Sequence, residues 1–132
     1  MFSTNVKVYF YDADPAGIIF YASVFKYVHA AYEDFMRSLS PTRNFFFDRE
    51  YILPIMHAEA DYVRPILVGD ELKVEVTVSL LKSSSFELTY RFYRADQFTA
   101  MAKTVHVCVL KEKFEKIELP KEFHDQLKLH QS

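Results

Sequence analysis

Two carboxylates and a glycine lie within six residues of one another near the start of the chain, in the segment Asp12-Ala13-Asp14-Pro15-Ala16-Gly17. Proline cannot donate a backbone hydrogen bond and glycine tolerates unusual backbone angles, so a turn is predicted here. Asp side chains often only hydrogen-bond the backbone of such turns. A carboxylate can also act as a nucleophile or a general base, so both interpretations are open.

The place of this turn in the chain favours chemistry at a carbonyl group. Gly17 directly precedes the apolar run 18–21, which leads into the one long helical pattern of the sequence. The first amides of a helix can stabilise negative charge that develops on an oxygen. A carboxylate beside them could attack the carbonyl carbon or orient a water molecule toward it. Hydrolysis of a thioester needs these parts and does not require a metal.

Metal catalysis is disfavoured by the spacing of the potential ligands. The five His and the single Cys form neither an HExxH motif nor paired CxxC motifs, and zinc sites depend on such spacings. We therefore expect no metal. Cys108 lies in an apolar strand pattern and is predicted to be a core thiol. His57 and His106 also fall in strand patterns and are predicted to be packed or edge residues.

One helix and several strands must position the turn. Apolar residues recur at spacings of three and four between residues 22 and 39, which predicts a helix that ends near Ser40, before Pro41. Period-two alternation predicts strands over residues 6–11, 72–80 and 86–92. Residues 57–64 are expected to form an extended strand closed by Pro65, and residues 99–110 are rich enough in Val and Thr to form a last strand. A short surface helix is expected over residues 120–129. The order predicts an α+β fold in which one long helix covers an antiparallel sheet.

Length and charge limit the classes of partner. The 132 residues fit a single domain spanning 1–132. The 16 basic and 18 acidic side chains give a net charge of −2, which offers no general attraction to nucleic acid or to an anionic membrane. No apolar stretch approaches the ~20 residues that cross a bilayer, and the N-terminus lacks a secretory pattern. We expect a cytoplasmic protein with no membrane insertion.

Nearly the whole chain resembles the 4-hydroxybenzoyl-CoA thioesterase family. The likeness is strongest in Tyr9-Phe10-Tyr11-Asp12-Ala13-Asp14-Pro15-Ala16-Gly17-Ile18-Ile19-Phe20-Tyr21, and it continues through Leu53-Pro54-Ile55, Arg64-Pro65 and Gly69-Asp70-Glu71-Leu72. The resemblance implies a hotdog fold, in which a sheet wraps around the helix. It also implies active sites at the interface of a homodimer, which often pairs into a homotetramer. No cofactor is expected, because coenzyme A is part of the acyl-CoA substrate.

The resemblance also assigns roles to single residues. Asp14 matches the catalytic carboxylate of the family, Gly17 its glycine at the site, and the backbone amide of Tyr21 its oxyanion donor. Some relatives carry His where Tyr21 stands, so a side-chain role in positioning water does not transfer to this chain. Asp12 matches no catalytic position and is predicted to cap the turn.

Two further groups are candidates for binding substrate. His29 and Glu33 are four residues apart and share one helix face, where they form either a solvated polar pair or a substrate contact. This stretch is similar to the 1,4-dihydroxy-2-naphthoyl-CoA thioesterases, which favours a bicyclic aromatic acyl group. Lys82 precedes three serines, of which Ser84 and Ser85 are candidates for binding the phosphates of coenzyme A. Hydroxybenzoyl-type relatives carry a more basic run there.

The expected activity is hydrolysis of an aromatic acyl-CoA to the free acid and coenzyme A. Three alternatives keep the fold. The substrate could be a short or medium aliphatic acyl-CoA or a thioester of acyl carrier protein, or the chain could bind acyl-CoA without turnover. A hydratase is disfavoured, because no His is paired with the Asp14 turn.

Overall fold

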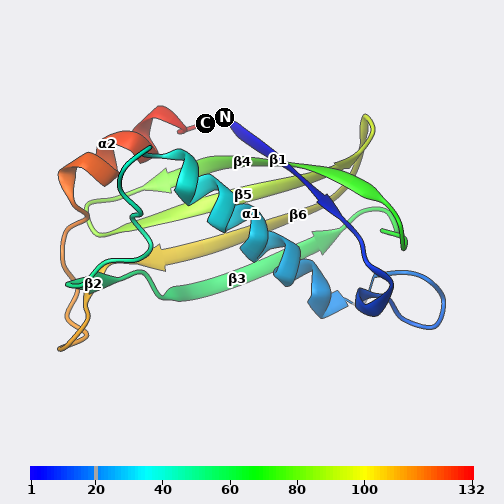
Figure 1. Ribbon diagram of the computed structural model, residues 1–132, viewed down its shortest axis with the longest axis horizontal. Coiled ribbons are helices and arrows are strands. Elements are labelled where there is room, and N and C mark those ends of the chain that lie inside the picture. The colour runs from blue at the N-terminus through cyan, green and yellow to red at the C-terminus, as the bar shows by residue number, and fades with distance from the viewer. Residues whose placement is uncertain (20) are drawn as a thin grey trace.

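A five-stranded antiparallel sheet carries one long helix across one face in the computed structural model, which describes residues 1–19 and 21–132 (Figure 1). Phe20, part of the apolar run after Gly17, lies outside the described residues. The strand order is β1-β4-β5-β6-β3, and β2 pairs with β7 in a separate two-stranded ribbon. The elements are β1 (Phe2–Lys7), α1 (Val24–Ser38), β2 (Tyr51–Ile52), β3 (Ile55–Tyr62), β4 (Glu71–Leu81), β5 (Ser85–Arg94), β6 (Gln97–Val107), β7 (Val109–Leu110) and α2 (Lys121–Leu129).

The core lies between α1 and the sheet, as the two periodicities predict. On β4, alternate residues are buried, namely Leu72, Val74, Val76 and Val78. On α1 the buried residues form one stripe, namely Val24, Tyr27, Val28, Ala31, Tyr32, Phe35 and Met36. Burying these side chains removes apolar area from water, which is the main favourable contribution to folding. The α+β fold and the long helix are thus confirmed.

The first strand does not lie where the alternation predicts it. Residues 6–11 were expected to be extended, whereas β1 spans Phe2–Lys7 and residues 10–12 form a 3-10 turn. The ladder with β4 ends at Lys7 and Glu71, although the Val8 amide still donates to the Asp70 carbonyl and the Val8 carbonyl accepts the Gly69 amide, both at 2.9 Å. Beyond Val8 the chain leaves the sheet and turns at residues 10–12.

The last predicted strand, over residues 99–110, is divided in two. β6 ends at Val107, and the amide of Cys108 donates to the Ser84 carbonyl at the start of β5, at 2.8 Å. The chain then leaves the main sheet and pairs with β2 as β7. Cys108 is buried, as expected of a core thiol, and burial raises the pKa of its thiol to about 11.

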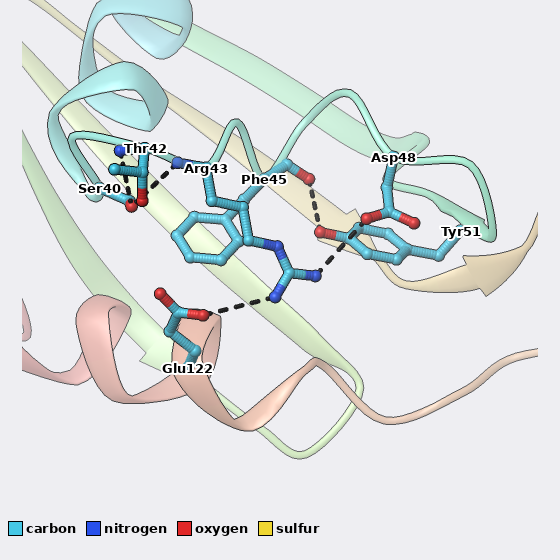
Figure 2. Close-up of polar contacts among 7 residues, drawn as sticks. All are labelled: Ser40, Thr42, Arg43, Phe45, Asp48, Tyr51 and Glu122. Carbon is cyan, nitrogen blue, oxygen red and sulfur yellow. Dashed lines mark hydrogen bonds and ion pairs between the residues drawn. The ribbon is translucent and has the colours of Figure 1, made fainter.

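The segment between α1 and β3 is fastened to the C-terminal helix (Figure 2). The Arg43 guanidinium lies between the carboxylates of Asp48 and Glu122, at 3.5 and 3.4 Å. The Tyr51 hydroxyl donates to the Phe45 carbonyl at 2.7 Å. These contacts close the end of the fold that lies next to α2. The opposite end carries the loop between β1 and α1 (Figure 1).

Strand β3 forms one edge of the sheet, and within the described part of the chain β6 is its one partner strand. Seven of its eight residues are exposed. Its outer backbone groups are a template for pairing with another strand.

Helix α2 packs on the core through Phe123 and Leu127, both fully buried. No helix among the described residues is long and apolar enough to span a membrane.

Candidate active site

The Asp14 carboxylate lies in a small closed loop between β1 and α1. Its Oδ1 accepts hydrogen bonds from the amides of Ala16 at 2.9 Å and Ile18 at 3.3 Å. The Asp14 amide donates to the Ile18 carbonyl at 2.8 Å, which closes the loop. Asp14 is exposed in the single chain, and among the described residues its Oδ2 accepts no hydrogen bond. One oxygen is therefore fixed, and the other is available to a ligand.

Gly17 gives the loop its backbone shape. Its φ of +79° lies in the left-handed region, where a side chain is unfavourable. Its amide donates to the Asp14 carbonyl at 3.0 Å, and its own carbonyl accepts the amide of Val68 at 3.1 Å. The Ile19 amide donates to the Ile66 carbonyl at 2.7 Å. The loop is thus attached to the segment that precedes β4.

Asp12 does not cap the turn, contrary to the sequence interpretation. Only 6% of the residue is exposed, and its Oδ2 accepts the Tyr27 hydroxyl at 2.6 Å and the Lys26 ammonium at 3.1 Å. The Tyr27 hydroxyl also accepts the Tyr9 amide at 3.0 Å. Burial, followed by the hydrogen bond to Asp12, raises the pKa of Tyr27 to about 12. The side chain of Asp12 is turned toward α1, so it fastens the loop to the first turn of that helix.

Tyr21 lies at the junction between the loop and the helix. It begins a 3-10 turn, Tyr21–Ser23, that runs directly into α1. Its side chain is 70% exposed, and its carbonyl accepts the hydroxyl of Tyr62 at the end of β3. The loop with Asp14 and the start of the helix are therefore at the same end of the molecule, as the sequence predicts. The oxyanion role of the Tyr21 amide stays a prediction.

A cavity of about 390 Å³ opens between α1 and the sheet. Its wall combines the first two turns of α1 with strands β3, β5 and β6. The lining residues are Phe25, Lys26, Val28, His29, Tyr32, Ile55, Ala58, Tyr90 and Thr104. The wall is mostly aromatic and aliphatic, and Lys26, which also binds Asp12, links it to the loop. Concave apolar sites with a few polar groups are typical of small-molecule binding.

The two predicted substrate contacts on α1 separate in the structure. His29 lines the cavity, and its ring centroid is 5.7 Å from that of Tyr32. Glu33 is exposed and pairs with Arg37 at 3.3 Å, and it is not among the residues that line the cavity. The structure therefore brings His29, and not Glu33, to the candidate site.

The predicted phosphate contacts lie at the other end of the sheet. Lys82 and Ser84 belong to the turn between β4 and β5, and Ser85 begins β5; this turn lies beside α2, whereas the Asp14 loop lies at the far end (Figure 1). The Leu119 amide donates to the Ser83 carbonyl at 2.9 Å, so the C-terminal segment packs on this turn. Ser84 is only 9% exposed. Within one chain, these residues do not join Asp14.

Other residues of the site escaped sequence analysis. Tyr27, Tyr90 and Thr104 are buried polar residues that lie next to the loop or the cavity. Thr104 and His106 are polar residues at inward-facing positions of β6, where the alternation calls for apolar side chains. This departure from the alternation was the sequence signal that could have marked them as site residues. Among the described residues, no group of three or more His, Cys, Asp or Glu side chains is placed to hold a metal ion.

A family model described as the thioesterase-like superfamily matches residues 8–127 of the sequence. The chain belongs to this superfamily. The match contains the Asp14 loop, α1 and every residue that lines the cavity.

Several proteins similar to this thioesterase-like chain come from cyanobacteria. A 1,4-dihydroxy-2-naphthoyl-CoA hydrolase of Synechococcus elongatus is 37% identical over 122 residues, which cover 91% of this chain and 90% of the relative. An enzyme of the same name from Microcystis aeruginosa is 35% identical and is matched over 86% of this chain and 83% of its own length. The crystal structure of a 1,4-dihydroxy-2-naphthoyl-CoA thioesterase from Synechocystis superposes with a TM-score of 0.86 at 29% identity, covering 96% of this chain and 95% of that one. This superposition confirms the hotdog fold.

Proposed function

We propose that the chain hydrolyses an aromatic acyl-CoA thioester to the free acid and coenzyme A, and that 1,4-dihydroxy-2-naphthoyl-CoA is the first substrate to test. The observation that carries this proposal is the exposed Asp14 carboxylate, held by two backbone amides in the loop that leads into α1, together with a mostly apolar cavity between α1 and the sheet. The names of the relatives from Synechococcus and Microcystis support the choice of acyl group. No cofactor is needed, and a cytoplasmic location stays a prediction.

The proposed mechanism divides the work between the loop and the helix. The thioester carbonyl would lie at the junction of the loop and α1, where the Tyr21 amide stabilises the oxyanion. Asp14 would act through Oδ2, either attacking the carbonyl carbon or removing a proton from water. Oδ1 is already held by two amides, which keeps the carboxylate oriented. The aromatic acyl group would fill the cavity that His29 lines.

We propose that two chains assemble through the β3 edge and that the site is completed there. Exposed apolar side chains, among them Met56, Tyr62 and Val63, accompany the unpaired edge of β3. Pairing two such edges would satisfy their backbone groups and bury these side chains. In this assembly a phosphate contact from Lys82 or Ser85 to a substrate at Asp14 would come from another chain. Pairing of two dimers into a tetramer stays a prediction.

The direct test is release of free thiol from a panel of thioesters. We expect turnover of aromatic acyl-CoA substrates to exceed that of aliphatic acyl-CoA and of acyl carrier protein thioesters. Preference for aliphatic chains would move the proposal to that class. Binding of coenzyme A without hydrolysis of any thioester would favour a non-catalytic acyl-CoA-binding protein.

The substitution Asp14→Asn tests the assignment of the carboxylate. We expect kcat to fall by about 10²–10⁴-fold, because the amide can neither attack nor accept a proton efficiently. The melting temperature should change little, since Asn can still accept the two backbone hydrogen bonds. Asp125→Asn, in an exposed carboxylate of α2, is the matched control and should keep normal turnover. Near-normal turnover of Asp14→Asn would reject the proposed mechanism.

A further inference from the structure

Three buried polar side chains form a continuous hydrogen-bonded chain behind the cavity. The hydroxyls of Tyr90 and Thr104 are 2.9 Å apart, and Thr104 Oγ1 lies 2.8 Å from Nε2 of His106. Tyr90 and His106 are fully buried, and Thr104 is 3% exposed. Tyr90 lies on β5, and Thr104 and His106 lie on β6. Tyr90 pairs with the buried Ala102, and Thr104 and His106 are the next residues of β6 on the same face, which is the face toward α1. The chain is thus built into the sheet.

The outer end of this polar chain forms part of the cavity wall. Tyr90 and Thr104 both line the cavity, whereas His106 lies behind them. Apart from them, the residues with polar groups in the described wall are Lys26 and His29, both exposed on α1, and the buried Tyr32. Buried polar groups cost free energy unless they are hydrogen-bonded, and Phe or Val would fill the same positions without that cost. A binding function accounts for polar groups at this place.

His106 holds the polar chain in position. Its ring is stacked between those of Tyr32 and Phe86, with centroids 4.5 and 4.8 Å away. Burial lowers the pKa of this histidine to about 4, so the ring is neutral near pH 7. Nε2 of the neutral ring either accepts a hydrogen bond from the Thr104 hydroxyl or donates one to it. In the first case Tyr90 Oη keeps a lone pair for a ligand. In the second case the Tyr90 proton is available to the ligand.

We propose that Tyr90 and Thr104, positioned by His106, recognise a hydroxyl group on the aromatic ring of the acyl group. This inference rests on the proposed function and extends it, because it names the chemical feature that the cavity selects. A ring hydroxyl can both donate and accept, so it matches either direction of the polar chain. An unsubstituted ring would leave the Tyr90 hydroxyl without that partner, and a site built for a hydroxyl discriminates against the analogue that lacks it.

The experiment compares two thioesters that differ by one hydroxyl. They are 1,4-dihydroxy-2-naphthoyl-CoA and 1-hydroxy-2-naphthoyl-CoA, with 4-hydroxybenzoyl-CoA and benzoyl-CoA as a second pair. We expect the wild-type protein to prefer the more hydroxylated member of at least one pair by about tenfold or more in kcat/KM. Thr104→Val and Tyr90→Phe should each reduce this preference to within about twofold. The loss of kcat/KM should fall mainly on the more hydroxylated member of each pair.

Thr89→Val is the matched control. Thr89 is also a buried threonine on β5, and its hydroxyl donates to Ser79 at 2.8 Å, but it faces the side of the sheet opposite to Tyr90. This variant should keep the wild-type preference. Equal kcat/KM for both members of each pair in the wild-type protein would overturn the inference and leave the thioesterase proposal intact. Absence of hydrolysis of all four thioesters would overturn both. An unchanged preference in folded Thr104→Val and Tyr90→Phe would also overturn the inference.

Discussion

The two residues that shape the loop between β1 and α1 act in different ways. Asp14 supplies the carboxylate, and its Oδ1 is held by two backbone amides. Gly17 supplies no side chain, but its positive φ allows the chain to reverse immediately after Asp14. A methyl group at Gly17 would meet no atom within 4 Å, so the cost of a substitution there is that of the backbone conformation.

Gly17→Ala is therefore expected to change the loop more than the fold. It should lower the free energy of unfolding by about 1 kcal/mol, because alanine disfavours the left-handed region. It should also lower kcat at least tenfold, since relief of the strain would move Asp14. Gly69→Ala is the control, with a φ of +85° and equally open surroundings. It should show a similar loss of stability in urea unfolding and a smaller loss of kcat. Equal effects of both variants on kcat would contradict this account.

His106 makes stability depend on pH. Its pKa is about 4 in the folded chain, because burial disfavours the charged ring, against 6.5 in the unfolded chain. Between pH 6.5 and pH 4 the unfolded state binds more protons at this histidine than the folded state does. The stability that neutral His106 contributes is therefore fully present above pH 6.5 and is lost as the pH falls toward 4. The full effect is about 3 kcal/mol. We expect wild type to lose more stability than His106→Gln between pH 7 and pH 4.5, measured by urea unfolding. Parallel losses would show that His106 is not responsible.

At the scale of the elements, the loop and α1 are joined by the hydrogen bonds of Tyr27. Its hydroxyl donates to the buried Asp12 carboxylate and accepts the Tyr9 amide. This contact fixes the loop relative to the start of the helix. The position of the Asp14 carboxylate relative to the amides at the start of α1 thus depends on Tyr27, which need not touch the substrate.

Tyr27→Phe tests this positioning role. Loss of the hydroxyl should lower the free energy of unfolding by about 1–3 kcal/mol, because it leaves the Asp12 carboxylate less satisfied. We expect kcat to fall about tenfold, with KM nearly unchanged. Tyr51→Phe removes an equally buried hydroxyl, which donates to the Phe45 carbonyl at the far end of the fold. It should lower stability but keep kcat. A normal kcat in Tyr27→Phe would show that the contact is only structural.

At the scale of the whole molecule, the unpaired β3 edge predicts self-association. Sedimentation analysis should give a mass of at least twice the 15.6 kDa of one chain at micromolar concentrations. Specific activity should fall when dilution separates the subunits, if the site is completed at their interface. A stable monomer with full activity would reject the proposed assembly while leaving Asp14 as the candidate catalytic residue.

The sequence determined the features that depend on local patterns. The 3.6-residue periodicity placed α1, the alternation placed β4 and β5, and the motif from Asp14 to Gly17 placed the loop, because these patterns act over a few neighbouring residues. Membership of the thioesterase-like superfamily agrees with the resemblance drawn from that motif.

Only the tertiary structure decided which side chains meet. It showed that Asp12 binds Tyr27, that Glu33 pairs with Arg37, and that the turn with Ser84 lies at the other end of the sheet from Asp14. It also showed that the first strand ends at Lys7 and that residues 10–12 turn, where the alternation predicted an extended chain. Alternation in a sequence indicates that a strand is possible. The partner of that strand, the burial of its side chains and the composition of a cavity depend on residues that are distant along the chain.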